Sequence, residues 1–393
     1  MSTTSSSEDL LLDQIAEEFE ERLRSGEQPT PSEYARKYPQ LAEHLLPFLK
    51  TITELVQTQE LLSHEESRTP QPPETGPDLQ IIELIGSGGM GSVWKAHQLS
   101  LDRPVAIKVL QHQTSGWGNS SQRFLEEARI ASLLVHDHIV PVHEIHSDAP
   151  RPWFIMQFIE GCSLATIIDL WKQQRGSARR KSSGALTPAP SPSPATPPQS
   201  SATSRHDNTA QKKYCREVPA HGYRRIAQWM QQAATAVHFA HEHNVLHRDL
   251  KPSNFLIDGS HRIWLTDFGL ARRSERTAIS LPGQAPGTLR YMSPEHCDGE
   301  ATKLSDVYSL GVTLYEMLAL TPAFSDNSPR SLRQRIRTGE YPPLRSHDPD
   351  IPRDLIVITE KAMALQPQDR YLSAQELAND LQRFVDGRPI MAR

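Results

Sequence analysis

Apolar residues at helical spacing mark the beginning of the chain. Leu11, Ile15 and Phe19 recur every four positions, and a second stripe of the same kind follows. Its members are Leu41, Leu45, Leu49, Ile52 and Val56. Between the stripes, the run Thr30-Pro31-Ser32-Glu33 matches a capping box with proline at the first helical position. The pattern predicts a small helical module over residues 1–63.

The pattern changes twice after this module. Residues 64–78 are polar, rich in proline and without periodicity, which is typical of a linker. From Leu79, strand-like runs give way to long helical patterns that continue to Asp386. We therefore expect a second domain over residues 79–386 and a short tail over residues 387–393.

A tract rich in Pro, Ser and Thr interrupts the second domain. It follows the helix-like SLATIIDLW and precedes a helical stripe formed by Ile226, Met230, Ala233, Val237 and Ala240. Both flanks look like parts of one folded region, and a long loop adds little closure entropy for its length. We interpret residues 173–220 as a disordered surface insertion within one domain.

Charge and cysteine content exclude several classes of protein. A formal net charge of −5 argues against a dominant nucleic-acid surface. Cys162, Cys215 and Cys297 are far apart, which indicates neither a disulfide framework nor a zinc site. The acidic N-terminus lacks a secretory signal, and no stretch reaches the ~18 apolar residues of a membrane span. These features predict a cytoplasmic protein with no membrane segment in this chain and no nucleic-acid partner.

The first chemical motif is IGSGGMGSV. It places Gly86, Gly88 and Gly91 in a G-x-G-x-x-G arrangement that brings backbone N–H groups close to phosphate oxygens. A glycine-rich hairpin turn fits this motif equally well. A dinucleotide site would open into a helix with an acidic residue about 20 positions on, whereas here a strand follows with Lys108 in VAIKVL. Lys108 is either a solvated edge lysine or a phosphate-binding lysine.

A helical segment, SSQRFLEEARIASLL, comes next and carries Glu126 and Glu127. One of them could pair with Lys108 and hold its ammonium against two phosphates. Glu127 is favoured because the apolar stripe of the helix lies beside it.

The most specific stretch is NVLHRDLKPSNFLIDGSHRIWLTDFGLA. His247-Arg248-Asp249, Asn254 and Asp267-Phe268-Gly269 follow one another in the order typical of protein kinases. The region from Leu79 to Asp386 resembles a serine/threonine protein kinase catalytic domain, most closely the bacterial eukaryotic-like members. The resemblance implies a two-lobed α+β fold, with an N-lobe of about five antiparallel strands and one helix, a mainly helical C-lobe, and ATP between them.

The resemblance also implies roles for single residues. Asp249 would be the catalytic base, and Lys251 would neutralise charge on the γ-phosphate. Asn254 and Asp267 would bind Mg²⁺. The residues implied to bind ATP are Ile85, Gly86, Ser87, Gly88, Gly89, Met90, Gly91, Ser92, Val93, Lys108, Glu127, Gln157 and Ile159. Met156 would control the depth of the adenine pocket.

Further residues bear on the acceptor and on the C-lobe. Lys251 and Thr288 resemble the pair that accompanies serine or threonine acceptors. MSPE stands where the family has Ala-Pro-Glu, and its Glu295 is expected to form a buried pair with Arg370. Asp306 is expected to bond the backbone of the catalytic loop.

Arg248 suggests regulation by phosphorylation. A basic residue beside the catalytic base can pair with a phosphate on the activation segment. The candidate phosphosites are Ser274, Thr277 and Ser280, each of which is equally well an ordinary loop hydroxyl.

The function expected from these features is transfer of the γ-phosphate of ATP to protein serine and threonine hydroxyls, including those of the chain itself. A pseudokinase scaffold that binds partners through the N-terminal helices is the alternative from another class. A small-molecule phosphotransferase would lack the Ser-Pro-Glu segment and Thr288. The helical module itself carries no chemistry, and docking of a partner or autoinhibition is its expected role.

Overall fold

The computed structural model describes residues 15–16, 18–19, 22–23, 27–42, 45–50, 52–53, 70–88, 91–110, 120–147, 151–182, 222–268, 286–326 and 328–392. The helices, strands and contacts given below belong to these residues. The chain divides into two compact units. One comprises residues 1–71 with 279–285, and the other residues 72–278 with 286–393.

The first unit has its own small core. Its elements are α2 Pro31–Lys37 and η1 Pro39–Leu41. Its buried residues are Ile15, Phe19, Tyr34, Leu41, Leu45, Leu49 and Ile52. The Tyr34 ring meets Phe19 edge-on at 5.3 Å, and its hydroxyl donates to Glu18 Oε1 at 3.0 Å. The predicted apolar stripes are thus buried where they are described, while Leu11 and Val56 lie outside the described residues.

The start of α2 differs from the sequence prediction in one respect. The helix begins at Pro31 as expected, but the Thr30 side chain makes no capping hydrogen bond. The Glu33 carboxylate, which a capping box would turn back toward Thr30, accepts a hydrogen bond from Arg22 Nη1 at 3.3 Å instead. An available guanidinium competes successfully with the backbone N–H because charged hydrogen bonds are the stronger ones.

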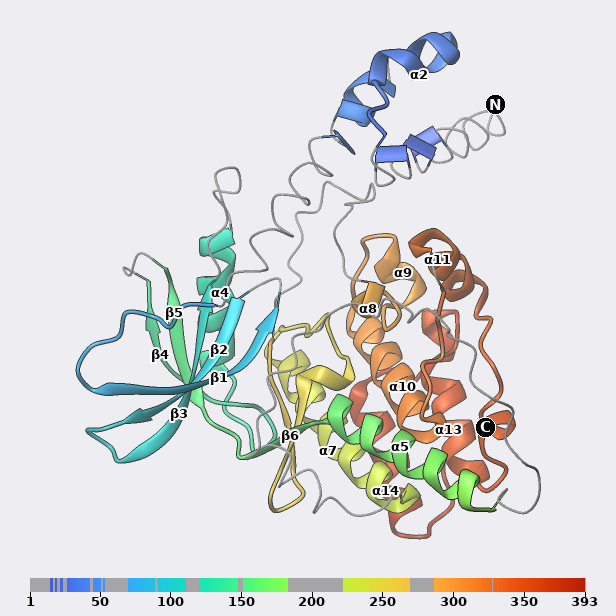
Figure 1. Cartoon of the computed structure of the whole chain (residues 1–393). Coiled ribbons are helices and arrows are strands. Elements are labelled where there is room, and N and C mark those ends of the chain that lie inside the picture. Colours follow the sequence, from blue (N-terminus) through green and yellow to red (C-terminus); the bar gives the residue numbers. More distant parts are fainter. Residues whose placement is uncertain are drawn as a thin grey trace, which may run out of the picture. The chain divides into compact units, whose positions relative to one another are not determined.

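The second unit begins with an antiparallel sheet in the strand order β1-β2-β3-β5-β4. Its elements are β1 Leu79–Gly88, β2 Gly91–Gln98, β3 Arg103–Leu110, α4 Ser120–Leu133, β4 Val142–His146 and β5 Trp153–Gln157. Figure 1 shows α4 alongside this sheet. The predicted β-rich lobe of about five strands and one helix is confirmed.

The side chains of each central strand point alternately into two buried apolar layers, one on each face of the sheet. Trp94, Ile107 and Trp153 belong to a cluster on one face, whereas Ala106 and Met156 belong to a separate cluster on the other. The period-2 geometry of strands sends alternate side chains to opposite faces. Both faces of β3 and β5 are therefore apolar, which makes a buried lysine on β3 conspicuous.

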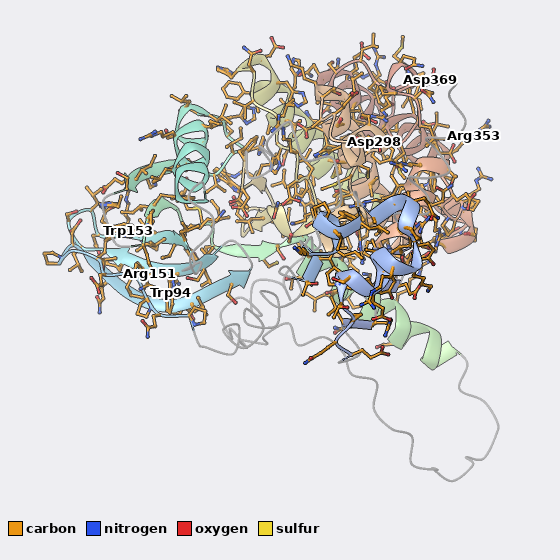
Figure 2. The ribbon with its side chains drawn as sticks, turned by 90° about the horizontal axis from the view of Figure 1, so that it is seen from above. Trp94, Arg151, Trp153, Asp298, Arg353 and Asp369 are labelled. Atoms are coloured by element: carbon orange, nitrogen blue, oxygen red, sulfur yellow. The ribbon has the colours of Figure 1, made fainter. Side chains whose placement is uncertain are left out.

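Part of the predicted linker is attached to this sheet. Arg151 Nη2 donates to the carbonyl of Pro72 at 2.8 Å, and Figure 2 shows Arg151 near Trp153 at the sheet. The Asp78 carboxylate accepts from the backbone N and the hydroxyl of Ser100 at 2.6 and 2.7 Å. The sequence predicted a linker here from composition alone. The residues that hold Asp78 and Pro72 in place lie 22 and 79 positions further along the chain, where local composition gives no sign of them.

The remainder of the second unit is mainly helical. Its elements are β6 Gly161–Ser163, α5 Leu164–Ser182, α7 Tyr223–Glu242, η2 Pro252–Asn254, β7 Phe255–Asp258, β8 Ile263–Leu265, α8 Pro286–Leu289, α9 Pro294–Cys297, α10 Lys303–Ala319, α11 Pro329–Thr338, α12 Leu344–His347, α13 Arg353–Ala362, η3 Pro367–Asp369 and α14 Ala374–Val385. Helix α7 packs against α10 and α14. In α10 every residue from Ser305 to Ala319 is buried, so this helix is the centre of the lobe. The stripe predicted on α7 is fully buried at Ile226, Met230, Ala233, Val237 and Ala240.

Helix α5 extends past the predicted start of the insertion. It is helical to Ser182, although the insertion was expected from residue 173. Arg175 anchors the first turn of this extension, because its Nη2 lies 2.9 Å from Asp348 Oδ2 and donates to the carbonyl of His347 at 2.8 Å. Tyr223, just after the gap in the described chain, donates to the same Asp348 oxygen at 3.0 Å. The rest of the predicted insertion, residues 183–220, lies outside the described residues.

None of the helices in the described part of the chain is long and apolar enough to cross a membrane.

Candidate functional site

The glycine motif forms the turn between β1 and β2. The antiparallel register continues into it through the pairs Gly86–Val93, Ser87–Ser92 and Gly88–Gly91. A Cβ atom on Gly91 would lie 2.1 Å from the carbonyl oxygen of Val109, so β2 approaches β3 here because residue 91 has no side chain. Ile85 packs with the inner apolar cluster of the sheet. Gly89 and Met90, at the tip of the predicted loop, lie outside the described residues.

Lys108 on β3 points into the inner layer and is only 4% exposed. Its Nζ donates to Asp267 Oδ1 at 2.9 Å and lies 5.8 Å from the centre of the Phe154 ring. Burial alone would raise the pKa of Asp267, but the charge of Lys108 outweighs burial and holds that pKa below its ordinary value. The two lobes thus meet in a buried ion pair, and the edge-lysine reading of Lys108 is wrong.

Glu127 lies on α4, where the backbone is described and the side chain is not. Its pairing with Lys108 stays a prediction, as does its preference over Glu126.

Asp249, Lys251 and Thr288 form a continuous polar chain. Lys251 Nζ lies 2.8 Å from Asp249 Oδ2 and donates to Thr288 Oγ1 at 3.0 Å. Asn254 Nδ2 donates to both Asp249 Oδ2, at 3.1 Å, and the Asp249 carbonyl, at 2.8 Å. Among the described residues, Asp249 Oδ1 has no hydrogen-bond partner. The Lys251 ammonium and the Asn254 amide therefore orient Oδ2, while Oδ1 is left to accept a proton.

Asn254 and Asp267 come from adjacent segments. The backbone N of Thr266 donates to the Asn254 carbonyl at 3.1 Å, which ties η2 to the residue before Asp267. The Asn254 amide nitrogen is engaged by Asp249, whereas its Oδ1 accepts from Ser253 Oγ at 3.3 Å and keeps a second acceptor position for a ligand. One amide oxygen and one carboxylate form a donor set that suits Mg²⁺, which takes few protein ligands and completes its shell with water and phosphate. The described residues hold no group of three or more His, Cys, Asp or Glu side chains arranged for a metal.

Asp306 on α10 holds the backbone of His247 and Arg248 in place. Its carboxylate accepts the backbone N–H of His247 at 2.9 Å and that of Arg248 at 2.8 Å. It also accepts a hydrogen bond from His241 Nε2 at 2.8 Å. Burial would raise the pKa of Asp306, but the hydrogen bond from His241 leads the interactions that hold it below its ordinary value. Sequence reasoning missed His241, which lies four positions after Val237 on α7 and belongs to none of the motifs.

His247 connects the two sides of the site as a neutral ring. Burial lowers its pKa. Its Nε2 lies 3.0 Å from the Thr266 carbonyl, to which it donates, and its Nδ1 accepts from the Asp249 backbone N at 3.4 Å. The ring also lies 4.5 Å from that of Phe268. Arg248 and Asp267, next to these groups, both have backbone φ near +65°, a region that costs most residues energy and that is found preferentially at functional sites.

The connection between the lobes begins at Met156. The backbone N of Gln157 donates to the Pro141 carbonyl at 2.9 Å, whereas Ile159 makes no backbone hydrogen bond to a described residue. A Cβ on Gly161 would lie 1.9 Å from the Ile257 carbonyl oxygen, so the chain crosses β7 at a point where only glycine fits. The backbone of Ile159 thus has no hydrogen bond to a described residue and lies among apolar side chains. A flat heterocyclic base needs both features in order to bind.

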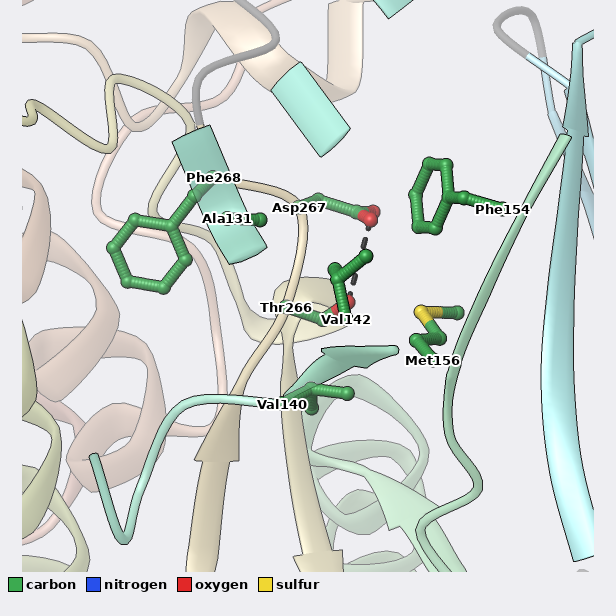
Figure 3. Close-up of a pocket in the computed structure, with 8 residues that line it drawn as sticks. All are labelled: Ala131, Val140, Val142, Phe154, Met156, Thr266, Asp267 and Phe268. Carbon is green, nitrogen blue, oxygen red and sulfur yellow. Dashed lines mark hydrogen bonds between the residues drawn. The ribbon is translucent and has the colours of Figure 1, made fainter. Parts of the chain in front are cut away.

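A small cavity adjoins Met156 (Figure 3). Its lining is Ala131, Val140, Val142, Phe154, Met156, Thr266, Asp267 and Phe268. The Thr266 hydroxyl donates to Asp267 Oδ1 at 3.3 Å, as the dashed line in Figure 3 shows. Met156 separates the lobe connection from this space.

Two apolar residues of the candidate nucleotide site were missed from the sequence. Ala106 and Leu256 pack in the same cluster as Val93 and Met156. Ala106 is two positions before Lys108 and Leu256 is two positions after Asn254. Strand alternation from those two polar residues could have found both.

Glu295 and Arg370 form a bidentate pair in which Arg370 is fully buried and Glu295 is half-buried. Arg370 Nη1 and Nη2 donate to the two Glu295 oxygens at 2.7 and 2.9 Å. The remaining Arg370 donors reach the carbonyls of Leu304, Ala364 and Leu365, so all five of its N–H groups are used. Burial alone would raise the pKa of Glu295, but Arg370 outweighs it and the pKa is about 2.

Ser274, Thr277 and Ser280 lie outside the described residues. Their pairing with Arg248 after phosphorylation stays a prediction.

The comparisons with known proteins agree with this geometry. A family model for protein tyrosine and serine/threonine kinases matches residues 79–381. Serine/threonine-protein kinase PknD of Chlamydia trachomatis serovar D is 32% identical over 335 residues, which cover 79% of this chain and 32% of that protein. Serine/threonine-protein kinase PknB of Mycobacterium leprae is 31% identical over 325 residues, which cover 81% of this chain and 44% of that protein.

The fold is likewise found among solved structures. The crystal structure of the Mycobacterium tuberculosis PknI kinase domain superposes with a TM-score of 0.52 at 21% identity, covering 80% of this chain and 99% of that domain. The chain spans less than half the length of PknD and PknB. From the family match and the order of the motifs, the chain belongs to the protein tyrosine and serine/threonine kinase family, among bacterial relatives of the eukaryotic-like type.

Proposed function

We propose that this chain transfers the γ-phosphoryl group of ATP to serine and threonine hydroxyls of proteins. The observation that carries the proposal is the polar chain Asp249–Lys251–Thr288, placed beside the two oxygen donors Asn254 and Asp267. Phosphoryl transfer depends more on positioning and charge neutralisation than on covalent chemistry, and this cluster supplies both.

Asp249 orients the acceptor hydroxyl and takes its proton. Its Oδ2 is held by Lys251 and Asn254, and its Oδ1 faces no described donor. In the reaction the acceptor oxygen forms a bond to the γ-phosphorus, the bond from that phosphorus to the bridging oxygen breaks, ADP leaves, and the proton passes to Asp249. Lys251 stays beside Asp249 and offers its charge to the transferred group.

Asn254 and Asp267 are the residues that would hold Mg²⁺, which neutralises phosphate charge when bound. Lys108 would bind phosphate oxygens while it keeps Asp267 ionised. The adenine would rest between Val93, Ala106 and Leu256, with the backbone of Gln157 and Ile159 at its edge.

Two features support a serine or threonine acceptor. Lys251 contacts Thr288, the pair that accompanies such acceptors in the family. The relatives PknD and PknB are themselves named serine/threonine-protein kinases. We extend the proposal to autophosphorylation, with Ser274, Thr277 and Ser280 as candidate sites and Arg248 as the residue that would pair with the phosphate.

We also propose the domain boundaries given above, with residues 1–63 as a docking or autoinhibitory module. A scaffold without phosphotransfer is the competing function. It would bind partners through that module and would need none of the polar groups around Asp249.

Mass spectrometry after incubation of the full chain with ATP and Mg²⁺ tests the proposal. Three peptides that differ only in a Ser, Thr or Tyr acceptor serve as substrates, and the chain's own phosphopeptides are mapped in the same samples. We expect phosphate on Ser and Thr peptides and on the chain, and none when Mg²⁺ is chelated. Unmodified peptides together with an unmodified chain would leave the scaffold as the better description.

A further inference from the structure

Arg290 lies two residues beyond Thr288, at the acceptor side of the site. The backbone N of Tyr291 donates to the Thr288 carbonyl at 3.2 Å, so residues 288–291 form a tight turn. A single lysine ammonium, that of Lys251, bridges Thr288 and Asp249. Thr288 Oγ1 and the proposed base are therefore within two hydrogen-bond lengths of each other, and Arg290 is part of the turn that begins at Thr288.

No ion pair joins the Arg290 guanidinium to a carboxylate of the described residues. Its Nε is buried and has no hydrogen-bond partner in the described part of the chain, although the residue as a whole is partly exposed. The neighbouring buried carboxylate, Glu316, accepts from the Tyr291 hydroxyl at 2.6 Å and lies 3.7 Å from Lys172 Nζ. A buried donor without an acceptor is uncommon and costs free energy, which an incoming acceptor would recover.

Helix α11 adds positive charge next to this turn. It packs against α8, which carries Thr288, and against α9. Its sequence PRSLRQRIRT contains four arginines and no acidic residue. Arg337 pairs with Asp298 and Arg335 donates to the Ser325 carbonyl at 2.8 Å. Because the helix carries four arginines and no carboxylate of its own, it makes the potential around Arg290 more positive.

We propose that Arg290 binds an acidic side chain of the protein substrate and so selects acceptors that have Asp or Glu close by in sequence. This inference rests on the proposed function, since it names the substrate class of the same site. Two residues of chain span at most about 7 Å between Cα atoms, and an extended peptide rises about 3.3 Å per residue. The acidic residue consequently lies within about four positions of the acceptor.

Steady-state kinetics with three matched peptides tests the proposal. Each has one Ser acceptor, flanked on both sides by three acidic residues, by their Gln and Asn counterparts, or by Lys. For the unmodified chain we expect the acidic peptide to have a KM about fivefold below that of the neutral peptide, because a partly exposed ion pair contributes a modest amount. Arg290→Gln should remove this difference, and Arg290→Glu should reverse it in favour of the Lys peptide.

Two further variants make the comparison specific. Arg290→Lys keeps the charge and should keep part of the preference, even if loss of the buried Nε lowers stability. Arg353→Gln removes an exposed arginine from α13, labelled in Figure 2, and should keep the full preference.

Binding is measured in parallel with fluorescein-labelled peptides in which Ala replaces the acceptor. Fluorescence anisotropy then reports acidic preference without phosphotransfer. A chain that phosphorylates none of the peptides yet binds the acidic one through Arg290 would contradict the proposed function and support this inference. An active chain that treats all three peptides alike, or an Arg290→Gln variant that retains the acidic preference, would overturn it.

Discussion

The Lys108 ammonium donates a 2.9 Å hydrogen bond to Asp267, a residue 159 positions later in the chain. Lys108 comes from the central strand of the sheet and Asp267 from the segment after β8. One contact thus joins a proposed phosphate-binding cation to a proposed metal ligand.

Lys108→Met should lower kcat/KM for ATP by about 10²- to 10³-fold, the usual loss when one electrostatic donor is removed from an active site. The pKa of Asp267 should rise at the same time, because burial would act without the compensating charge. Kinetics at several ATP concentrations measure the first effect. Lys303→Met, at an exposed lysine that starts α10, is the matched control and should retain the activity of the unmodified chain.

Arg370→Lys should reduce the free energy of unfolding by about 3–5 kcal/mol, because a buried carboxylate loses its bidentate partner. Lysine has three N–H donors where arginine has five, and its ammonium cannot form two parallel hydrogen bonds with the planar Glu295 carboxylate. Urea denaturation measures the change. A loss below about 1 kcal/mol would mean that the pair behaves like a surface ion pair.

Stability should fall in acid through the same pair. The pKa of Glu295 is about 2 in the folded chain, against an ordinary value of 4.5. A lowered folded-state pKa contributes stability that is complete above pH 4.5 and is lost as the pH falls from there toward 2. The free energy of unfolding of Glu295→Gln should therefore depend less steeply on pH between 5 and 3. Equal slopes for the two proteins would count against the buried pair.

Gly161→Ala should weaken ATP binding, since the new Cβ would lie 1.9 Å from the Ile257 carbonyl oxygen and displace the connection between the lobes. We expect KM for ATP to rise about tenfold or more, because small displacements of positioning groups are costly. The matched control is Gly176→Ala on α5, where no atom lies within 4 Å of the added Cβ. That variant should gain about 0.5–1 kcal/mol of stability, because alanine favours a helix interior over glycine.

Asp306→Asn should lower kcat by about 10- to 100-fold with a smaller change in KM for ATP. Asparagine keeps the size of the side chain, but it has a single accepting oxygen and cannot accept both the His247 and the Arg248 N–H groups, which the two carboxylate oxygens now accept. The loop that carries Asp249 would shift while the adenine pocket stays intact. Asp354→Asn, at an exposed position on α13, controls for the loss of one charge. A kcat unchanged by Asp306→Asn would show that the loop holds its shape without this residue.

Much of the fold was predictable because its patterns are local. The apolar strand VAIKVL and the buried stripe of α7 each follow from neighbouring residues, and both are present in the structure. The glycine motif, Asp249, Asn254 and Asp267 were selected from the order of short motifs along the chain.

The features that were missed depend on distant partners. The extension of α5 past residue 173 is anchored by Arg175 and Asp348, and the end of the linker is held by Arg151 and Ser100. His241 was not selected from the sequence because its partner, Asp306, lies 65 positions away. Local periodicity carries no information about such pairs.

Phosphate transfer by the unmodified chain and by Asp249→Asn is the most direct test of the central claim. Both proteins are incubated with γ-labelled ATP, Mg²⁺ and a serine peptide, with Asp350→Asn at an exposed aspartate as control. The account predicts labelled peptide from the unmodified chain and the control, and a rate about 10²- to 10⁴-fold lower from Asp249→Asn, which lacks the proton acceptor. Equal rates from Asp249→Asn and the unmodified chain would contradict it.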